Sequence, residues 1–378
     1  MSSGSLLETL QHRLSSAEIS APSVRGVLTR VTGMILSARG VRAPLGAYCE
    51  VMAEEGEGIV CEVVGFRDGE VMLMPLSAVQ GLLPGTAVRV LTLTARVGVG
   101  AGLLGRVVDG LGEPLDRGPA IVPDVFVPLR GERKNPLHRA AITAPLDVGV
   151  RAINTFLTVG RGQRIGLIAG SGVGKSMLLG MMTRFTEADV IVIGMIGERG
   201  REVLDFVHET LGEEGLKRSV VIAAPGDRSP VVRLRATHYS CAVAEYFRDQ
   251  GKNVLLLMDS LTRVAHAQRE VGLAVGEPPT TKGYTPSVFF LINELVERAG
   301  NVSAAGSITG IYTILAEGDD ANDPIVDGAR AILDGHVLLS REIAAMGQYP
   351  AIDISVSVSR LATKLISGER RALVTKFR

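Results

Sequence analysis

Apolar residues along this 378-residue chain follow two different patterns, and each pattern predicts a different kind of domain. From Ile142 onward, nearly continuous apolar runs recur, with helical segments between several of them. Such runs are typical of parallel strands that helices bury on both faces. We therefore expect an α/β domain with strands at 165–168, 190–196, 220–223, 254–258, 308–315 and 336–339.

The region from Val24 to about Thr94 instead has short β-branched and apolar runs separated by Gly, Pro and Asp. Strands are expected at 27–31, 58–64, 70–76 and 87–90, and Arg67-Asp68-Gly69 predicts a hairpin turn. Closely spaced strands of this kind favour a small barrel or sandwich. We assign residues 23–94 to a β-barrel domain.

Residues 1–22 are expected to form an amphipathic helix or tail. Within 5–18, the apolar residues fall at helical spacing and form one stripe, which consists of Leu6, Leu7, Leu10 and Leu14. Ser5 with Glu8 makes a capping-box pattern at its start. The stripe fits docking on a partner or a membrane surface, and it equally fits packing on its own domain.

The Gly- and Pro-rich segment 95–145 is expected to connect the two domains and to lie over the second one, which we take as residues 95–378. Hydrophobic residues make up 46% of the chain and charged residues 21%, a composition typical of a globular protein. We find no signal peptide and no apolar run of 18 residues, so we expect a cytoplasmic protein.

Charge and cysteine content exclude several functions. Forty basic residues balance forty acidic ones, so the chain has no overall attraction to nucleic acid, and no nucleic-acid partner is expected. Cys49, Cys61 and Cys241 are widely spaced and match no metal-binding pattern, which favours buried thiols.

The segment 164–176 carries the strongest chemical signal. An apolar strand ends in Gly170-Ser171-Gly172-Val173-Gly174-Lys175-Ser176, and a helical pattern follows. This is a phosphate-binding P-loop, in which backbone N–H groups and a helix N-terminus surround phosphate oxygens. The first motif position is Ala169 instead of Gly. We expect all seven residues to bind ATP, with Lys175 on the β- and γ-phosphates and Ser176 as a Mg²⁺ ligand.

Two carboxylates complete the predicted site. Asp259 closes the apolar run 254–258, the arrangement in which a Walker-B aspartate holds Mg²⁺ directly or through water. Glu198 follows the strand 190–196, where a carboxylate can polarise the attacking water, and we take it as the general base.

Several longer motifs resemble those of rotary ATPase catalytic subunits and, most closely, the type III export ATPase of the bacterial flagellum. The resemblance covers about 24–361. It is carried by the P-loop, the Asp259 segment and the stretches 197–203, 245–251, 267–270, 276–284, 318–324 and 348–353. It implies a RecA-like P-loop ATPase core behind a small β-barrel. The segment 180–189 favours the flagellar branch over the injectisome branch.

The resemblance also implies roles that the residues alone do not give. Tyr349 matches an aromatic residue that stacks on adenine, and Arg199 matches an arginine beside the phosphates. Arg360 matches an arginine that reaches the γ-phosphate held by a neighbouring subunit. The family forms homohexamers and works with stalk and regulator proteins, chaperone–substrate complexes and an inner-membrane export gate.

In one respect the chain departs from that family. Members continue past the arginine finger with a helical C-terminal domain, whereas here only a basic stretch, 364–377, follows, with one or two expected helical turns. Four alternatives stay open at this point: an injectisome ATPase, a catalytic subunit of a rotary proton-translocating ATPase, a hexameric nucleic-acid translocase, and a ring component that does not hydrolyse ATP.

Overall fold

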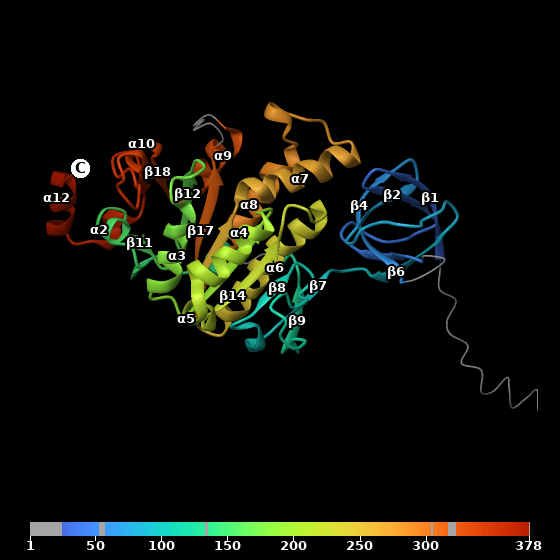
Figure 1. Ribbon diagram of the computed structural model, residues 1–378, viewed down its shortest axis with the longest axis horizontal. Helices are drawn as coiled ribbons and strands as arrows, with labels where there is room; N and C mark the ends of the chain where they lie inside the picture. Colours follow the sequence, from blue (N-terminus) through green and yellow to red (C-terminus); the bar gives the residue numbers. More distant parts are fainter. Residues whose placement is uncertain (1–24, 53–56, 133–134, 304, 317–322, 378) are drawn as a thin grey trace, which may run out of the picture.

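The computed structural model describes residues 25–52, 57–132, 135–303, 305–316 and 323–377. The amphipathic helix expected within 5–18 lies outside these residues. Figure 1 shows a β-barrel at one end of the molecule and a larger α/β domain with the C-terminus at the other. Their arrangement confirms the predicted fold class.

The barrel is closed, and its hydrogen-bonded strand order is β1-β2-β5-β4-β3-β6. Its strands are β1 (Arg25–Thr32), β2 (Ile35–Arg39), β3 (Tyr48–Val51), β4 (Ile59–Arg67), β5 (Glu70–Pro75) and β6 (Ala87–Thr92). The expected hairpin joins β4 to β5, and both of its turn residues, Asp68 and Gly69, have positive φ. This is the backbone that a two-residue turn between twisted strands requires.

The α/β domain is built on a nine-stranded sheet. The strand order is β19 (Val358–Ser359), β18 (Gly335–Leu339), β12 (Arg164–Ala169), β17 (Ser307–Leu315), β15 (Asn253–Asp259), β13 (Val190–Ile196), β14 (Ser219–Ala224) and β8 (Val107–Asp109), with β16 (Gly300–Asn301) beside β17. The strands from β18 to β8 pair in parallel. Their carboxyl ends therefore meet at one edge, which is where such sheets bind ligands.

Helices cover both faces of this sheet and enclose two apolar cores. One face carries α6 (Pro230–Asp249), α7 (Leu261–Val275), α8 (Pro286–Arg298) and α9 (Pro324–Ile332). The other carries α2 (Arg151–Phe156), α3 (Lys175–Phe185), the π-helix η3 (Phe206–Leu211) and α5 (Gly212–Lys217). Every residue of β13 is buried, as expected for a strand between two helical layers.

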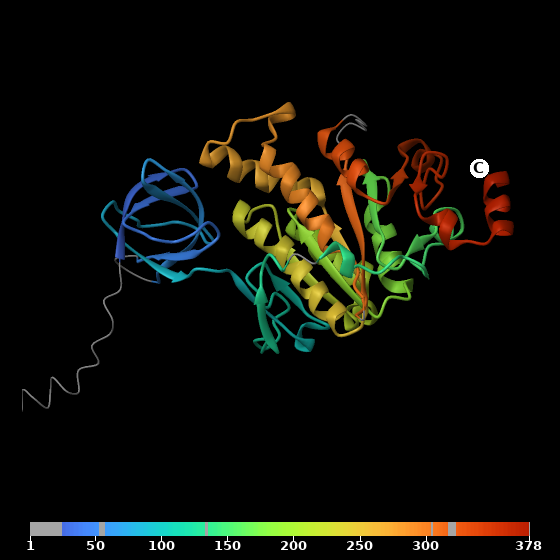
Figure 2. The same ribbon diagram turned by 180° about the vertical axis from the view of Figure 1, so that it is seen from behind.

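The segment 95–145 does more than connect the domains. Figure 2 shows it between the barrel and the α/β domain. It forms a two-stranded sheet from β7 (Arg96–Val99) and β9 (Val125–Pro128), and it supplies β8 to the edge of the main sheet. The expectation of a purely connecting segment was therefore incomplete. The pairing of β8 with β14 joins residues more than 100 positions apart, which local pattern does not reveal.

The remaining elements are short. They are η1 (Ala101–Leu103), η2 (Pro136–His138), β10 (Pro145–Leu146), β11 (Val159–Gly160), α4 (Gly200–Asp205), η4 (Thr281–Gly283), α10 (Arg341–Ala345), α11 (Ala362–Leu365) and α12 (Gly368–Phe377). The expectation of one or two helical turns within 364–377 was wrong, because α12 spans ten residues. Its interior, Glu369–Lys376, contains neither Gly nor Pro, so nothing there interrupts a helix.

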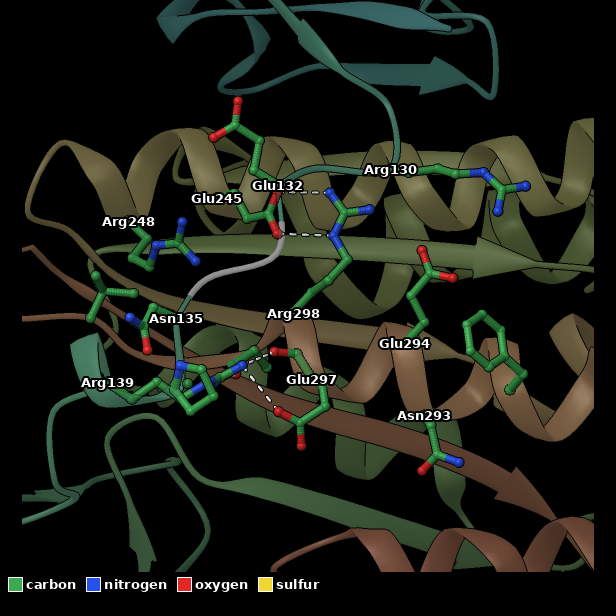
Figure 3. Close-up of a pocket in the computed structure, with 15 residues that line it drawn as sticks. Arg130, Glu132, Asn135, Arg139, Glu245, Arg248, Asn293, Glu294, Glu297 and Arg298 are labelled. Carbon is green, nitrogen blue, oxygen red and sulfur yellow. Dashed lines mark hydrogen bonds and ion pairs between the residues drawn. The ribbon is translucent and has the colours of Figure 1, made fainter. Parts of the chain in front are cut away.

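A cavity of about 700 Å³ lies between residues 130–132 and 135–139 on one side and helices α6 and α8 on the other (Figure 3). Arg298 on α8 forms a two-point ion pair with Glu245 on α6, with N–O distances of 2.9 and 2.7 Å, and also donates to the Leu129 carbonyl. Arg139 binds Glu297 and the Ala299 carbonyl in the same cavity. These contacts fasten the connecting segment to the helical layer.

Beneath this cavity, His238 on α6 is 3% exposed, and its Nδ1 accepts a hydrogen bond from Arg298 at 3.3 Å. Burial, together with the nearby charges of Arg298 and Arg130, lowers the pKa of His238 well below 6.5. The folded protein therefore holds this imidazole neutral. In the unfolded chain it gains a proton below about pH 6.5.

We expect the contribution of His238 to the free energy of unfolding to fall as the pH drops below 6.5, because the unfolded state then binds a proton that the folded state excludes. This group contributes a slope of up to about 1.4 kcal/mol per pH unit. Urea unfolding of the parent and of His238→Asn at pH values around and below 6.5 measures this slope. The substitution should remove this contribution from the parent's slope, and the exposed-site control His208→Asn should leave the parent's slope unchanged. Equal slopes in parent and His238→Asn would show that the imidazole is protonated in the fold.

Candidate functional site

The P-loop joins the carboxyl end of β12 to the first turn of α3. Gly172 and Gly174 have φ values of 78° and 88°, a left-handed backbone that costs little only for glycine. Between them, Val173 is 2% exposed and anchors the loop in the core. The loop is therefore held by a buried side chain while its backbone N–H groups surround an open hollow, as phosphate binding requires.

Ala169 occupies the first motif position as the last residue of β12. It is fully buried, and its carbonyl accepts a hydrogen bond from Ala316 at 3.1 Å. Its φ is not positive, so this position has ordinary strand geometry and needs no glycine. The departure from the strict motif leaves the loop conformation intact.

Lys175 lies between the two predicted carboxylates. Its Nζ is 2.5 Å from Oδ1 of Asp259 and 3.5 Å from Oε1 of Glu198. The three groups come from the P-loop, the end of β15 and the loop after β13, whose carboxyl ends share one sheet edge. The fold therefore brings together residues that are 84 positions apart in the chain.

Burial shapes the protonation of this cluster. Burial alone would lower the pKa of Lys175, but the charges of Asp259 and Glu198 outweigh it and raise that pKa. Burial raises the pKa of Glu198 to about 7, with Lys175 opposing the shift and Asp259 adding to it. A carboxylate of this pKa is suited to exchange a proton near neutral pH.

One oxygen of Glu198 is left without a hydrogen bond. Oε1 is buried and has no hydrogen-bond partner in the described part of the chain, and the ammonium of Lys175 is no closer than 3.5 Å. A buried carboxylate oxygen costs free energy unless something fills that position. Glu198 Oε1 therefore keeps capacity to accept a hydrogen bond beside the P-loop.

Lys175 and Glu198 open onto a cavity of about 630 Å³, whereas Asp259 does not line it and is reached through the Lys175 ammonium. Its lining includes six of the seven predicted P-loop residues, together with Glu198, Arg199, Glu202, Arg263 and Arg341. The seventh, Val173, points its side chain into the core, as described above. The Ser176 hydroxyl belongs to the first turn of α3 at the cavity wall.

The three residues implied by family resemblance lie in different places. Arg199 borders the cavity, with its side chain 88% exposed and 3.8 Å from Glu202. The Tyr349 ring lies against the P-loop, because a Cβ on Gly174 would stand 3.3 Å from its carbons. Arg360 does not line this cavity. It lies at the β19 edge of the sheet and donates to the Arg330 carbonyl at 2.9 Å.

Sequence reasoning missed two residues of this site. Arg263 packs against Gly197 beside Glu198, and its side chain borders the cavity. Thr313, on β17, donates a hydrogen bond to Asp259 at 2.6 Å. A lone threonine within the apolar and aromatic run 311–315 is the signal that could have found Thr313.

Among the described residues, no helix is both long and apolar enough to cross a bilayer. That part of the chain likewise contains no cluster of three or more His, Cys, Asp or Glu side chains suited to a metal ion. The three cysteines are free and buried, as expected.

The fold and the site define a P-loop ATPase, and comparison with known proteins agrees. The ATP synthase alpha/beta family nucleotide-binding domain matches residues 149–359, and the beta-barrel domain of the same family matches residues 28–91. The chain belongs to the ATP synthase alpha/beta family and is an ATPase of its type III export branch.

Among individual relatives, the flagellum-specific ATP synthase of Pseudomonas aeruginosa is 56% identical, over 94% of this chain and 80% of the relative. The type 3 secretion system ATPase of Xanthomonas euvesicatoria is 47% identical, over 98% and 86%. The assembled ATPase EscN of the enteropathogenic E. coli type III secretion system is 43% identical, over 93% and 84%, with a TM-score of 0.87. EscN has also been solved with its central stalk EscO. The higher identity supports the flagellar branch, and the injectisome alternative is not favoured.

Proposed function

We propose that this chain is the cytoplasmic motor of flagellar type III protein export. It would hydrolyse Mg²⁺·ATP to release export substrates from their chaperones and deliver them to an inner-membrane export gate, at whose cytoplasmic face it would bind peripherally. The observation that carries the proposal is the convergence of Lys175, Glu198 and Asp259 at the P-loop edge of the sheet.

The oxygen donors present fit Mg²⁺, which prefers few carboxylates and retains several waters. Both hydrogen bonds to the Asp259 carboxylate fall on Oδ1, so Oδ2 has no hydrogen-bond partner among the described residues. Ser176 adds a hydroxyl at the cavity wall. When bound, the ion would neutralise charge on the phosphates. We assign Asp259 and Ser176 to hold it.

We assign the roles of the other site residues from their positions around the cavity. The P-loop N–H groups bind the triphosphate, and Lys175 moves from Asp259 to the β- and γ-phosphates. Glu198 holds the attacking water at Oε1, which has no hydrogen bond among the described residues, and accepts its proton. Tyr349, whose ring lies near Gly174, would stack on adenine, and Arg199 would contact phosphate oxygens from the exposed side.

Arg360 is assigned to a site on a neighbouring subunit. It lies outside the cavity of its own chain and is exposed at the far edge of the sheet. An arginine that stabilises transition-state charge across an interface couples hydrolysis to assembly. We therefore propose a homohexameric ring, and the solved complex of EscN with its stalk supports a stalk partner for this chain as well. Nucleic acid is not among the proposed partners.

ATPase activity per subunit is expected to rise with protein concentration, in parallel with oligomer size. The reason is that each active site lacks its arginine until a neighbour binds. Hydrolysis assays over a concentration series, with light scattering on the same samples, measure both quantities. Activity per subunit that stays constant while the oligomer forms would contradict the shared-site assignment.

A further inference from the structure

Thr313 lies inside the sheet on β17, between two strands that carry residues of the site. β17 pairs with β12, which leads into the P-loop, and with β15, which ends at Asp259. Its side chain is fully buried, and its neighbours Tyr312 and Ile314 are also buried. A hydroxyl in such surroundings costs free energy unless it makes a hydrogen bond.

The hydroxyl has one hydrogen and two acceptors within reach. Oδ1 of Asp259 lies at 2.6 Å and the Met258 carbonyl at 3.3 Å, so the hydrogen goes to the carboxylate. Hydrogen bonds to a charged acceptor are the shorter and stronger kind. Thr313 therefore acts on Asp259 as a donor.

Asp259 Oδ1 thus accepts two hydrogen bonds, and its donors differ in freedom. Lys175 reaches it through a flexible four-carbon side chain, and the same ammonium is the group assigned to the phosphates. Thr313 is β-branched, lies within a strand and is held by packing on both sides. When Lys175 turns to a nucleotide, Thr313 remains as the donor on Oδ1.

Fixing Oδ1 determines where Oδ2 points. Oδ2 has no hydrogen bond in the described part of the chain, yet it is not among the unpartnered side-chain atoms that are sealed from solvent. It is therefore the carboxylate oxygen that can reach the ion or one of the ion's waters. Rotation of the carboxylate would remove it from that position.

We propose that Thr313 is a positioning residue for Mg²⁺ binding, because its hydroxyl fixes the rotation of the Asp259 carboxylate and so presents Oδ2 to the metal. The inference rests on the proposed Mg²⁺·ATP chemistry of this site and adds a determinant of metal affinity to it. It assigns Thr313 no contact with nucleotide.

The test is equilibrium binding of a fluorescent ADP analogue to the full chain, with Mg²⁺ titrated and with EDTA present. Thr313→Val keeps the shape of the side chain and removes the hydroxyl. The Mg²⁺ concentration for half-maximal effect should rise about tenfold, equivalent to about 1.4 kcal/mol, while binding in EDTA stays unchanged. Thr313→Ser restores the hydroxyl and should restore the parent's Mg²⁺ requirement.

Thr309→Val is the matched control. Thr309 lies on the same strand, is 1% exposed and accepts a hydrogen bond from the Gly162 N–H at 2.8 Å, away from Asp259. The Thr309→Val substitution should lower the midpoint temperature of unfolding without changing the Mg²⁺ requirement for nucleotide binding. If Thr313→Val yields unfolded protein, Thr313→Ala removes the hydroxyl without adding a methyl group and serves in its place.

The binding test distinguishes failure of the positioning role of Thr313 from failure of the proposed function. Variants at Thr313 that require no more Mg²⁺ than the parent would overturn the positioning role and leave the proposed function standing. A parent chain whose binding of the ADP analogue does not respond to Mg²⁺ would overturn the metal assignment of the proposed function, and the role of Thr313 with it.

Discussion

Glu198→Gln is expected to lower the rate of ATP hydrolysis by about 10²–10⁴-fold while leaving ATP affinity nearly unchanged. Glutamine keeps the size of the side chain but cannot accept the proton of the attacking water. The parent carboxylate has a buried Oε1 with no hydrogen bond in the described part of the chain and a pKa of about 7, both of which suit a general base. Single-turnover hydrolysis and equilibrium ATP binding on the same preparations separate the two effects.

Glu202→Gln provides the control for this prediction. Glu202 lies one helical turn further along and borders the same cavity, but its side chain is 51% exposed and forms an ion pair with Arg199. The same change of chemistry there should leave most of the activity. If both variants lose activity equally, the loss reflects the charge of the loop and Glu198 has no special part in it.

The parts of this site that the sequence predicts share one property: each is local. The P-loop is a continuous strand, turn and helix, and Asp259 directly closes its own strand. Hydrophobic pattern and glycine placement are local signals, so they suffice for these elements. Six of the nine sheet strands were predictable for the same reason, since each is a largely apolar run, whereas the short strands β8, β16 and β19 were not predicted.

The parts that the sequence does not predict depend on contacts between distant segments. Thr313 reads as one polar position in an apolar run, and only the insertion of β17 between β12 and β15 places it at Asp259. The ion pair of Arg298 with Glu245 spans 53 positions between two helices. Strand order and helix packing decide these contacts, and neither produces a periodic pattern of residues in the sequence.

Family resemblance supplied a third kind of information, about residues that the isolated chain does not bring together. Arg360 forms no ion pair within the described part of the chain, and its guanidinium donates to a backbone carbonyl at the sheet edge. Nothing in its own sequence neighbourhood marks it as catalytic. Its role therefore has to be tested between subunits.

Arg360→Ala is expected to lower the rate of hydrolysis by about 10³–10⁵-fold, the effect of removing an arginine finger, with ATP binding by the single subunit retained. Arg370→Ala is the control, since Arg370 is also exposed and also donates to a backbone carbonyl, that of Asn154. Equal activity of Arg360→Ala and the parent in assembled rings would contradict the assignment.

Mixing two inactive variants then distinguishes a shared site from one contained in a single chain. Lys175→Ala lacks a working P-loop but keeps Arg360, whereas Arg360→Ala keeps the P-loop. In a ring formed from equal amounts of both, about a quarter of the interfaces pair an intact P-loop with an intact neighbouring arginine. Activity should therefore reappear on mixing if Arg360 acts on the neighbour. If Arg360 served its own chain, every subunit would carry a defect and the mixture would stay inactive.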